Sequence, residues 1–295
     1  MMNPFYRDYG DFLAGHFDFK VQKLTVDAGF TCPNRDGSLG RGGCIYCNNS
    51  SFSPTTGSEG RSVSEQLADG KRFFAAKYPN MRYLAYFQSY TSTYGDIDRL
   101  LGFYREALAV DDVVGIVIGT RPDCMPQPLL EALAEINRHY KVFIEYGAET
   151  SHDSTLRAIN RCHDWATTVD AVRRTADAGI PVGLHLILGL PGETTDMMLE
   201  TVDRVSALPI DTVKFHQLQI VRGTRLAADY LAGRADLRIF DIDEYVALCA
   251  RIVRRLRKDI AIERFVSQSP DRLLIAPRWG LKNYQFTNLL HKYLE

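Results

Sequence analysis

The sequence contains no apolar run long enough to cross a bilayer, and no apolar stretch follows a basic start near residue 1. We therefore expect a cytoplasmic protein with no membrane partner. In a reducing compartment, clustered cysteines more often bind metals or act in catalysis than form disulfides. Net charge is also nearly absent, because 35 Lys and Arg residues face 36 Asp and Glu residues. This balance argues against strong bulk attraction to nucleic acid, although a local basic face is compatible with it.

Sequence repeats, low-complexity segments and linkers are missing from residues 1–240, so we interpret that stretch as one domain. Apolar, β-branched runs alternate along it with segments of helical period. We predict strands at residues 20–28, 82–88, 113–120, 141–148, 182–189 and 212–221, and helices at 62–77, 96–109, 126–139, 164–178 and 194–207. Repeated βα units of this size predict an α/β fold, a partial TIM-like (β/α)6 barrel with its chemistry at the carboxyl ends of the strands.

The last part of the chain, residues 241–295, has a different composition. From Arg251 to Glu295, ten Lys or Arg residues stand against four acidic residues, which leaves a surplus of six positive charges. We expect a helix at 242–258, a strand near 260–266, a loop and a final helix. This second unit is predicted to be a C-terminal α/β extension that caps one end of the barrel.

Three of the six cysteines, Cys32, Cys44 and Cys47, lie close together in "TCPNRDGSLGRGGCIYCNNSSF". Four interpretations compete. A zinc site would need a fourth Cys or His ligand, and His16 is the nearest histidine. A disulfide would leave an odd thiol, and three buried structural cysteines would not suit a loop rich in Gly, Asn and Asp. The fourth interpretation is a [4Fe–4S] cluster held by three thiolates, with one iron open to a small-molecule ligand.

A three-cysteine loop after the first strand of a (β/α)6 barrel resembles the radical S-adenosylmethionine (radical SAM) superfamily. That superfamily most often spaces the cysteines C-x3-C-x2-C, whereas the first gap here holds eleven residues. The ordered motifs resemble a narrower group, the YhcC/YtqA-like proteins: "CPNRDGSLGRGGCIYC", "RCHD", "HLILGLPGE", "KFHQL", "GTRL" and "APRW". Two segments, "TRPD" and "RCHD", also resemble the elongator catalytic subunit.

The resemblance implies roles for individual residues. Cys32, Cys44 and Cys47 would bind the cluster, and Tyr46 would lie beside the adenine ring of S-adenosylmethionine (SAM). In the segment "EYGAETSHDSTLRAINRCHD", Glu149 would bind the ribose of SAM. Arg161 in that segment would bind the carboxylate of SAM, because a guanidinium fork suits that anion. The structural alternative for this arginine is an ion pair with Asp164.

The resemblance also indicates which residues after the second strand would hold the methionine amino group. The usual glycine-rich segment is replaced here by "YFQSYTSTY". Backbone carbonyls of Gln88 and Ser89 would serve that amino group, together with a hydroxyl from Thr91 or Thr93.

Several remaining histidines and cysteines have both structural and functional interpretations. His185 and His216 lie inside strands, where a histidine is often a hydrogen-bonded core group, but both alternate toward the barrel mouth. We include His185 among the cofactor-binding candidates. Cys124 and Cys249 are predicted to be buried small hydrophobic groups, and Cys162 is given no role.

The activity that the resemblance implies is reductive cleavage of SAM to methionine and a 5′-deoxyadenosyl radical, which then takes a hydrogen from an unactivated carbon. An electron donor such as flavodoxin or ferredoxin is implied as a partner. The first substrate hypothesis is tRNA, modified on the C5 side chain of the wobble uridine. The alternatives are a small metabolite or a protein as substrate, and a non-catalytic iron–sulfur or zinc protein.

Overall fold

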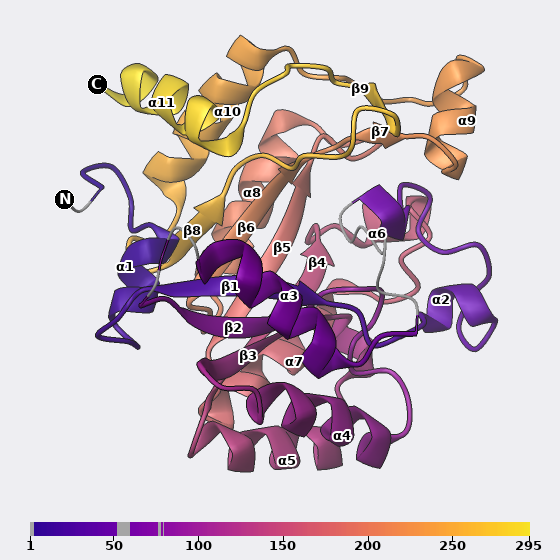
Figure 1. Ribbon diagram of the computed structural model, residues 1–295. Coiled ribbons are helices and arrows are strands. Elements are labelled where there is room, and N and C mark those ends of the chain that lie inside the picture. The colour runs from indigo at the N-terminus through magenta and orange to yellow at the C-terminus, as the bar shows by residue number, and fades with distance from the viewer. Residues whose placement is uncertain (1–2, 52–59, 76–77, 79) are drawn as a thin grey trace.

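The computed structural model describes residues 3–51, 60–75, 78 and 80–295, and within these ranges seven parallel strands form one curved sheet (Figure 1). Its order is β1-β2-β3-β4-β5-β6-β8, with β1 and β8 as the two edges. The strands are β1 (Val21–Val26), β2 (Arg82–Phe87), β3 (Val113–Thr120), β4 (Lys141–Glu149), β5 (Val182–Leu188), β6 (Thr212–Gln217) and β8 (Ala261–Arg264). This arrangement confirms the predicted partial barrel.

Helices that follow the first five strands cover the outside of the sheet, and Figure 1 shows α4 and α5 along one side of it. They are α3 (Val63–Ala75), α4 (Ile97–Leu108), α5 (Gln127–Asn137), α7 (Trp165–Asp177) and α8 (Thr195–Ser206). All five predicted helices are confirmed, although residues 76–77 of the first prediction lie outside the described ranges. A capping box opens α3, where Ser62 N donates to Glu65 Oε2 at 2.7 Å and Glu65 N donates to Ser62 Oγ at 3.2 Å. No helix among the described residues is long and apolar enough to cross a membrane.

Short elements account for most differences from the sequence prediction, because they contain too few residues to show a period. The helices that were not predicted are α1 (Tyr9–Ala14), α2 (Pro33–Asp36), α6 (Asp153–Ala158), α9 (Arg225–Leu231) and the 3-10 turns η1 (Asn49–Ser51) and η2 (Pro122–Cys124). The strand predicted at 212–221 ends as β6 and resumes as β7 (Ile220–Val221). The β7 strand pairs antiparallel with β9 (Leu274–Ala276), inside a segment predicted to be a loop.

The amino ends of the strands are closed by α1. Its Phe12 is 2% exposed and packs edge-on against Phe143 of β4, with ring centroids 5.6 Å apart. Leu84, Val117 and Ala261 belong to the same apolar cluster inside the barrel. This end is therefore filled with side chains, and a ligand would have to enter from elsewhere, such as the carboxyl ends of the strands.

The C-terminal residues take part in the main sheet. The strand predicted near 260–266 is β8, which pairs parallel with β6. Outside the sheet, α10 (Ile242–Arg255) packs against α8, and α11 (Asn283–Leu294) packs against α10. The division at residue 240 therefore does not coincide with a break in the sheet. The C-terminal segment supplies an edge strand, and Arg264 at the end of β8 reaches the open end of the barrel together with residues 267–269.

Candidate functional site

A cavity of about 290 Å³ lies at the carboxyl ends of the strands. Residues on or after six strands of the sheet, together with the cysteine loop, contribute to its wall. The cavity brings together most of the predicted site residues: Cys32, Cys44, Tyr46, Cys47, Gln88, Thr91, Glu149, Arg161 and His185. These residues are separated by up to 153 positions in the sequence, so the barrel topology is what assembles the site.

Ser89 and Thr93, two predicted contacts of the SAM amino group, are not among the residues that line the cavity. Ser89 is fully buried, and its backbone carbonyl accepts a hydrogen bond from Ser92 Oγ at 3.4 Å. Thr93 Oγ1 lies 2.6 Å from Thr120 Oγ1 and also donates to the Cys124 carbonyl. The structure therefore places those two side chains behind the cavity wall.

The eleven residues between Cys32 and Cys44 fold back on themselves. Cys32 precedes α2, whose Pro33 carbonyl accepts from Leu39 N at 2.9 Å. Gly43 N then donates to the Asn34 carbonyl at 2.8 Å, which returns the chain beside α2 just before Cys44. The long gap is thus a compact turn that brings the first and second cysteines to one cavity.

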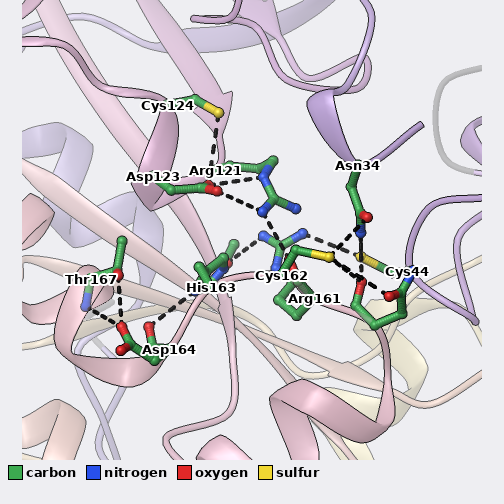
Figure 2. A network of polar contacts seen from close by, with 12 residues as sticks. Asn34, Cys44, Arg121, Asp123, Cys124, Arg161, Cys162, His163, Asp164 and Thr167 are labelled. Carbon is green, nitrogen blue, oxygen red and sulfur yellow. Dashed lines mark hydrogen bonds and ion pairs between the residues drawn. The ribbon is translucent and has the colours of Figure 1, made fainter. Parts of the chain in front are cut away.

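Asn34 and Arg161 both donate to the sulfur of Cys44 (Figure 2). The Asn34 Nδ2 to Cys44 Sγ distance is 3.7 Å, and the Arg161 Nη1 to Cys44 Sγ distance is 3.6 Å. Asn160 fixes the same loop, because its Nδ2 donates to the Gly43 carbonyl at 2.8 Å. The segment "NRC" at 160–162 therefore supports the cysteine loop directly.

The alternative prediction, an ion pair between Arg161 and Asp164, is wrong. Asp164 caps α7 instead, accepting from Thr167 N at 2.9 Å and from Thr167 Oγ1 at 2.7 Å (Figure 2). Arg161 turns toward the cavity, where Nη2 donates to the Gly147 carbonyl at 2.5 Å and lies 3.4 Å from Glu149 Oε1. A Cβ at residue 147 would lie only 2.6 Å from Arg161 Nη2 and 2.8 Å from Glu149 Oε1, so a larger residue there would displace both side-chain ends.

Arg121 is a site residue that the sequence analysis did not single out, although "TRPD" contains it. It is 2% exposed and makes a bidentate ion pair with Asp123, at 2.9 Å from Nε to Oδ1 and 2.8 Å from Nη2 to Oδ2. It also donates to the Arg161 carbonyl at 2.8 Å. Within the described ranges, Arg121 Nη1, Arg161 Nε and Thr91 Oγ1 are buried and have no hydrogen-bond partner. The cavity wall therefore offers hydrogen-bonding capacity that the protein itself does not use.

Beneath the cavity, four charged side chains form a closed set, which we call the ion-pair ring: Lys23 (β1), Glu145 (β4), Lys214 (β6) and Glu263 (β8). Lys23 Nζ lies 2.6 Å from Glu145 Oε1 and 2.8 Å from Glu263 Oε2. Lys214 Nζ lies 2.9 Å from Glu145 Oε2 and 3.0 Å from Glu263 Oε1. Burial alone would raise the pKa of Glu145, but Lys214 and Lys23 lower it well below its ordinary value. Two ammonium groups and two carboxylates balance each other in this ring.

His185 lies between the cavity and the ion-pair ring. Its side chain lines the cavity, and its Nε2 lies 2.8 Å from Glu145 Oε2. Burial, followed by Lys214, lowers the pKa of His185, so the imidazole is neutral at neutral pH. Its predicted contact with SAM stays a prediction.

The remaining three cysteines and His16 lie outside the residues that line the cavity. Cys124 and Cys249 are buried, at 8% and 0% exposure, as predicted. Cys162 is exposed and its Sγ lies 3.1 Å from Asn34 Oδ1. His16 packs against Phe12 at the closed end of the barrel, with ring centroids 4.7 Å apart, so it lies away from the cysteine loop and cannot complete a zinc site there.

Comparison with known proteins places this arrangement in a family. Residues 32–205 match the radical SAM superfamily, and residues 210–295 match the radical SAM C-terminal domain. This chain belongs to the radical SAM superfamily. The protein YhcC of Escherichia coli K12 is 38% identical over 97% of this chain and 91% of its own length. YtqA of Bacillus subtilis is 35% identical over 96% of this chain and 87% of its own length, which confirms the YhcC/YtqA-like resemblance.

More distant similarity connects this radical SAM protein to archaeal proteins. A tRNA uridine(34) acetyltransferase of Methanocaldococcus infernus is 23% identical over 62% of this chain, which spans only 33% of that protein. The solved structure of Elp3 from the same organism, lacking residues 1–46, superposes with a TM-score of 0.66 at 16% identity. That superposition covers 93% of this chain and 62% of the Elp3 chain, and it supports the fold.

The side chains of this radical SAM protein fit the cofactors that the family implies. Each thiolate of a four-iron cluster binds a different iron, so three cysteines around one cavity suit a cluster with one open iron. Burial, followed by the neighbouring Cys44, raises the pKa of the Cys47 thiol to about 11. Bound iron would displace that proton, and Arg35, whose Nη2 donates to the Cys47 carbonyl at 2.8 Å, lies close enough to offset thiolate charge. The unused donors of Arg121 and Arg161 suit the carboxylate of SAM.

Proposed function

We propose that this chain is a radical SAM enzyme that binds a [4Fe–4S] cluster through Cys32, Cys44 and Cys47 and modifies the C5 side chain of the wobble uridine in tRNA. The observation that carries the proposal is one shared cavity that holds three thiols and two buried guanidinium groups with unused donors, as far as the structure describes the chain. When bound, the reduced cluster would supply the electron that breaks the sulfonium C–S bond of SAM.

The protein groups around this cofactor bind and orient it. Arg161 is held by Gly147 and Glu149 at a fixed distance from Cys44, so a carboxylate on its free edge is oriented relative to the cluster loop. Tyr46 lies between two of the cysteines in the sequence and lines the same cavity, so it would be the contact for adenine. The apolar side chains packed beneath α1 keep water from entering through the amino ends of the strands.

Support for a tRNA substrate comes from the relatives and from the charges around the cavity mouth. Exposed arginines lie on the segments that border it: Arg41 in the cysteine loop, Arg222, whose carbonyl accepts from Asn48 Nδ2 at 2.8 Å, and Arg272 before β9. Arginines so placed can bind phosphates, which dominate affinity for RNA. An electron donor such as flavodoxin or ferredoxin would dock at the cysteine loop, in a reducing cytoplasm.

The test of the chemistry is SAM cleavage. Anaerobically reconstituted protein, given dithionite and SAM, is expected to form 5′-deoxyadenosine, measured by liquid chromatography and mass spectrometry. Cys44→Ala should abolish both the cluster absorbance and the product. Cys249→Ala is the matched control, since Cys249 lies in α10 and outside the cavity lining, and it should retain both. No product from wild type with a full complement of iron would indicate a non-catalytic protein instead.

The test of the substrate is nucleoside mass spectrometry of tRNA from a strain that lacks the gene. We expect a wobble uridine with an altered C5 side chain to accumulate, and the wild-type gene but not the Cys44→Ala gene to reverse this. An unchanged wobble-uridine profile in a strain whose purified enzyme cleaves SAM would contradict the tRNA substrate and point to a small metabolite or a protein.

A further inference from the structure

The side-chain amide of Asn34 is buried beside Cys44, inside the loop that joins the first two cysteines (Figure 2). Its Nδ2 lies 2.5 Å from the Asn160 carbonyl, and because a carbonyl can only accept, this contact identifies the NH2 end of the amide. The same nitrogen lies 3.7 Å from Cys44 Sγ, to which it donates its second hydrogen. The amide therefore presents a donor to Cys44 and turns its oxygen elsewhere.

The oxygen of that amide meets the thiol of Cys162. Cys162 Sγ lies 3.1 Å from Asn34 Oδ1, and a thiol, which is mostly protonated at neutral pH, donates its hydrogen to an amide oxygen. The amide is thus held at both ends, by a carbonyl acceptor on Nδ2 and by a thiol donor on Oδ1. A flipped amide would lose both contacts and would turn its oxygen toward Cys44. Cys162 therefore sets the direction of the donor that faces Cys44.

The backbone at Cys162 would suit glycine better than cysteine. Its φ of 62° lies in the left-handed region, which glycine adopts freely and residues with a Cβ adopt less readily. Strained backbone of this kind is concentrated at functional sites. The thiol, and not the backbone, is therefore what a cysteine contributes at this position, and its contact with Asn34 gives that thiol a use.

The eleven-residue gap between Cys32 and Cys44 encloses the amide. Gly40, within the gap, lies so close that an added Cβ would collide with Asn34 Oδ1 and would lie 3.1 Å from Cys162 Sγ. Gly40 N donates to the Pro33 carbonyl at 3.2 Å, which fixes this close approach. Asn34 is 0% exposed as a result, and a hydrogen bond is stronger where water does not compete for the donor.

We propose that Asn34 raises the reduction potential of the cluster by donating to the Cys44 thiolate, and that Cys162 is the positioning residue that orients the Asn34 amide. The inference rests on the proposed function for the cluster that the cysteines would bind, and not for the tRNA substrate. A reduced cluster carries one more negative charge than an oxidised one, so N–H donors to its thiolates favour the reduced form. One electron moves in this reduction, from a reduced flavodoxin or ferredoxin to the cluster, and no bond forms or breaks. Arg161 Nη1, 3.6 Å from the same sulfur, is a second donor that acts in the same direction.

The experiment is a redox titration of the reconstituted protein without SAM, with dithionite and mediator dyes, in which the EPR signal of the reduced cluster is followed against potential. Asn34→Leu nearly keeps the shape of the side chain and removes its donor. At a fixed potential, the ratio of reduced to oxidised cluster should fall about tenfold, which corresponds to a midpoint potential lower by about 59 mV for one electron. Cys249→Ala, in α10 and outside the cavity lining, is the control and should titrate like wild type.

Two variants of Cys162 separate an effect on the cluster from an effect on packing. Cys162→Gly removes the thiol and relieves the left-handed backbone, so the variant should be at least as stable as wild type in urea. Its ratio of reduced to oxidised cluster should nevertheless fall about threefold, because the Asn34 amide loses one of its two fixed ends. Cys162→Ser keeps a donor to Asn34 Oδ1 and should titrate like wild type. If Asn34→Leu fails to fold or to hold iron, these two variants decide the test.

An unchanged midpoint potential in Asn34→Leu with a full complement of iron would overturn the inference. A Cys162→Gly variant that loses stability and keeps its potential would make Cys162 a packing residue and overturn its positioning role. The proposed function fails separately. If the potential depends on Asn34 but the wild type forms no 5′-deoxyadenosine from SAM, the enzyme assignment fails and the role of Asn34 stands. A wild type that holds no four-iron cluster after reconstitution would overturn both.

Discussion

Two polar layers lie one above the other inside the barrel, and residues that are close in sequence belong to different layers. Glu263 closes the ion-pair ring, whereas the next residue, Arg264, faces the cavity with its Nε unpaired within the described chain. Lys214 has two carboxylates within 3.0 Å, whereas His216, two residues later, has an unused Nε2 there. The fully paired layer joins the edge strands β1 and β8, while the unpaired layer is suited to a ligand. Polar groups that all have partners thus mark a structural part of the interior, and polar groups without partners mark a part suited to binding.

The largest expected effect comes from breaking the paired layer. Glu145→Ala would leave Lys23 and Lys214 buried with only Glu263 between them, and we expect a loss of about 3–5 kcal/mol in the free energy of unfolding. Urea denaturation of the wild type and variant measures this loss. The double variant Glu145→Ala/Lys214→Met should recover part of it, because one buried ammonium group is removed. Equal stability of wild type and Glu145→Ala would show that the ring does not hold the edge strands together.

A smaller effect is expected for Tyr86→Phe. The Tyr86 hydroxyl donates to Glu145 Oε2 at 2.7 Å, and Lys214 Nζ donates to that hydroxyl at 3.1 Å. Because the ring stays and only hydrogen bonds to charged groups are lost, the cost should be about 1.5–3 kcal/mol, measured in the same urea titration. A cost as large as that of Glu145→Ala would mean that the hydroxyl, and not the charge balance, is decisive.

The pH dependence of stability tests the unpaired layer. Because the folded pKa of His216 is lowered below its unfolded value, near 6.5, its contribution is fully present above about pH 6.5 and is lost as pH falls through the folded pKa. Between pH 7.5 and 5.5 this one group should cost about 1 kcal/mol. His216→Gln should reduce the measured loss of unfolding free energy over that interval by this amount. An unchanged pH dependence in the variant would contradict a neutral, buried His216.

The smallest expected effect, and one of opposite sign, is that of Arg264→Met on folding. Removing a partly buried charge without a carboxylate partner should leave the unfolding free energy unchanged or raise it by up to about 1 kcal/mol. Thermal and urea unfolding measure it. Measuring Glu145→Ala and Arg264→Met together compares the two layers directly. Each variant removes one charge from the same interior, the first from the paired layer and the second from the unpaired layer. A destabilisation of several kcal/mol by Arg264→Met would make Arg264 part of the structural layer.

Much of the fold could be predicted from the sequence, because buried parallel strands and capped helices have strong local patterns. The cysteine loop, Tyr46 and Arg161 could be found because their motifs are contiguous. The roles of Lys23 and Glu263 could not be predicted, since their Nζ and Oε2 atoms meet across 240 residues of sequence. Arg264 faces inward only because of a bulge, and alternation would assign it to the outer face. The carbonyl of Ser89 shows a related limit, since position within a motif does not determine whether a residue lines the cavity.

The span of the ion-pair ring has a consequence for how the protein is made. Lys23 leaves the ribosome early, and Glu263 follows 240 residues later. Until β8 emerges, two interior ammonium groups share the single carboxylate of Glu145, so closing the barrel would bury an excess charge. We therefore expect the nascent chain to keep its interior hydrated through most of synthesis, and iron and sulfide to have access to the cysteine loop throughout that period. The β8 strand then completes the sheet and brings the Glu263 carboxylate to both lysines.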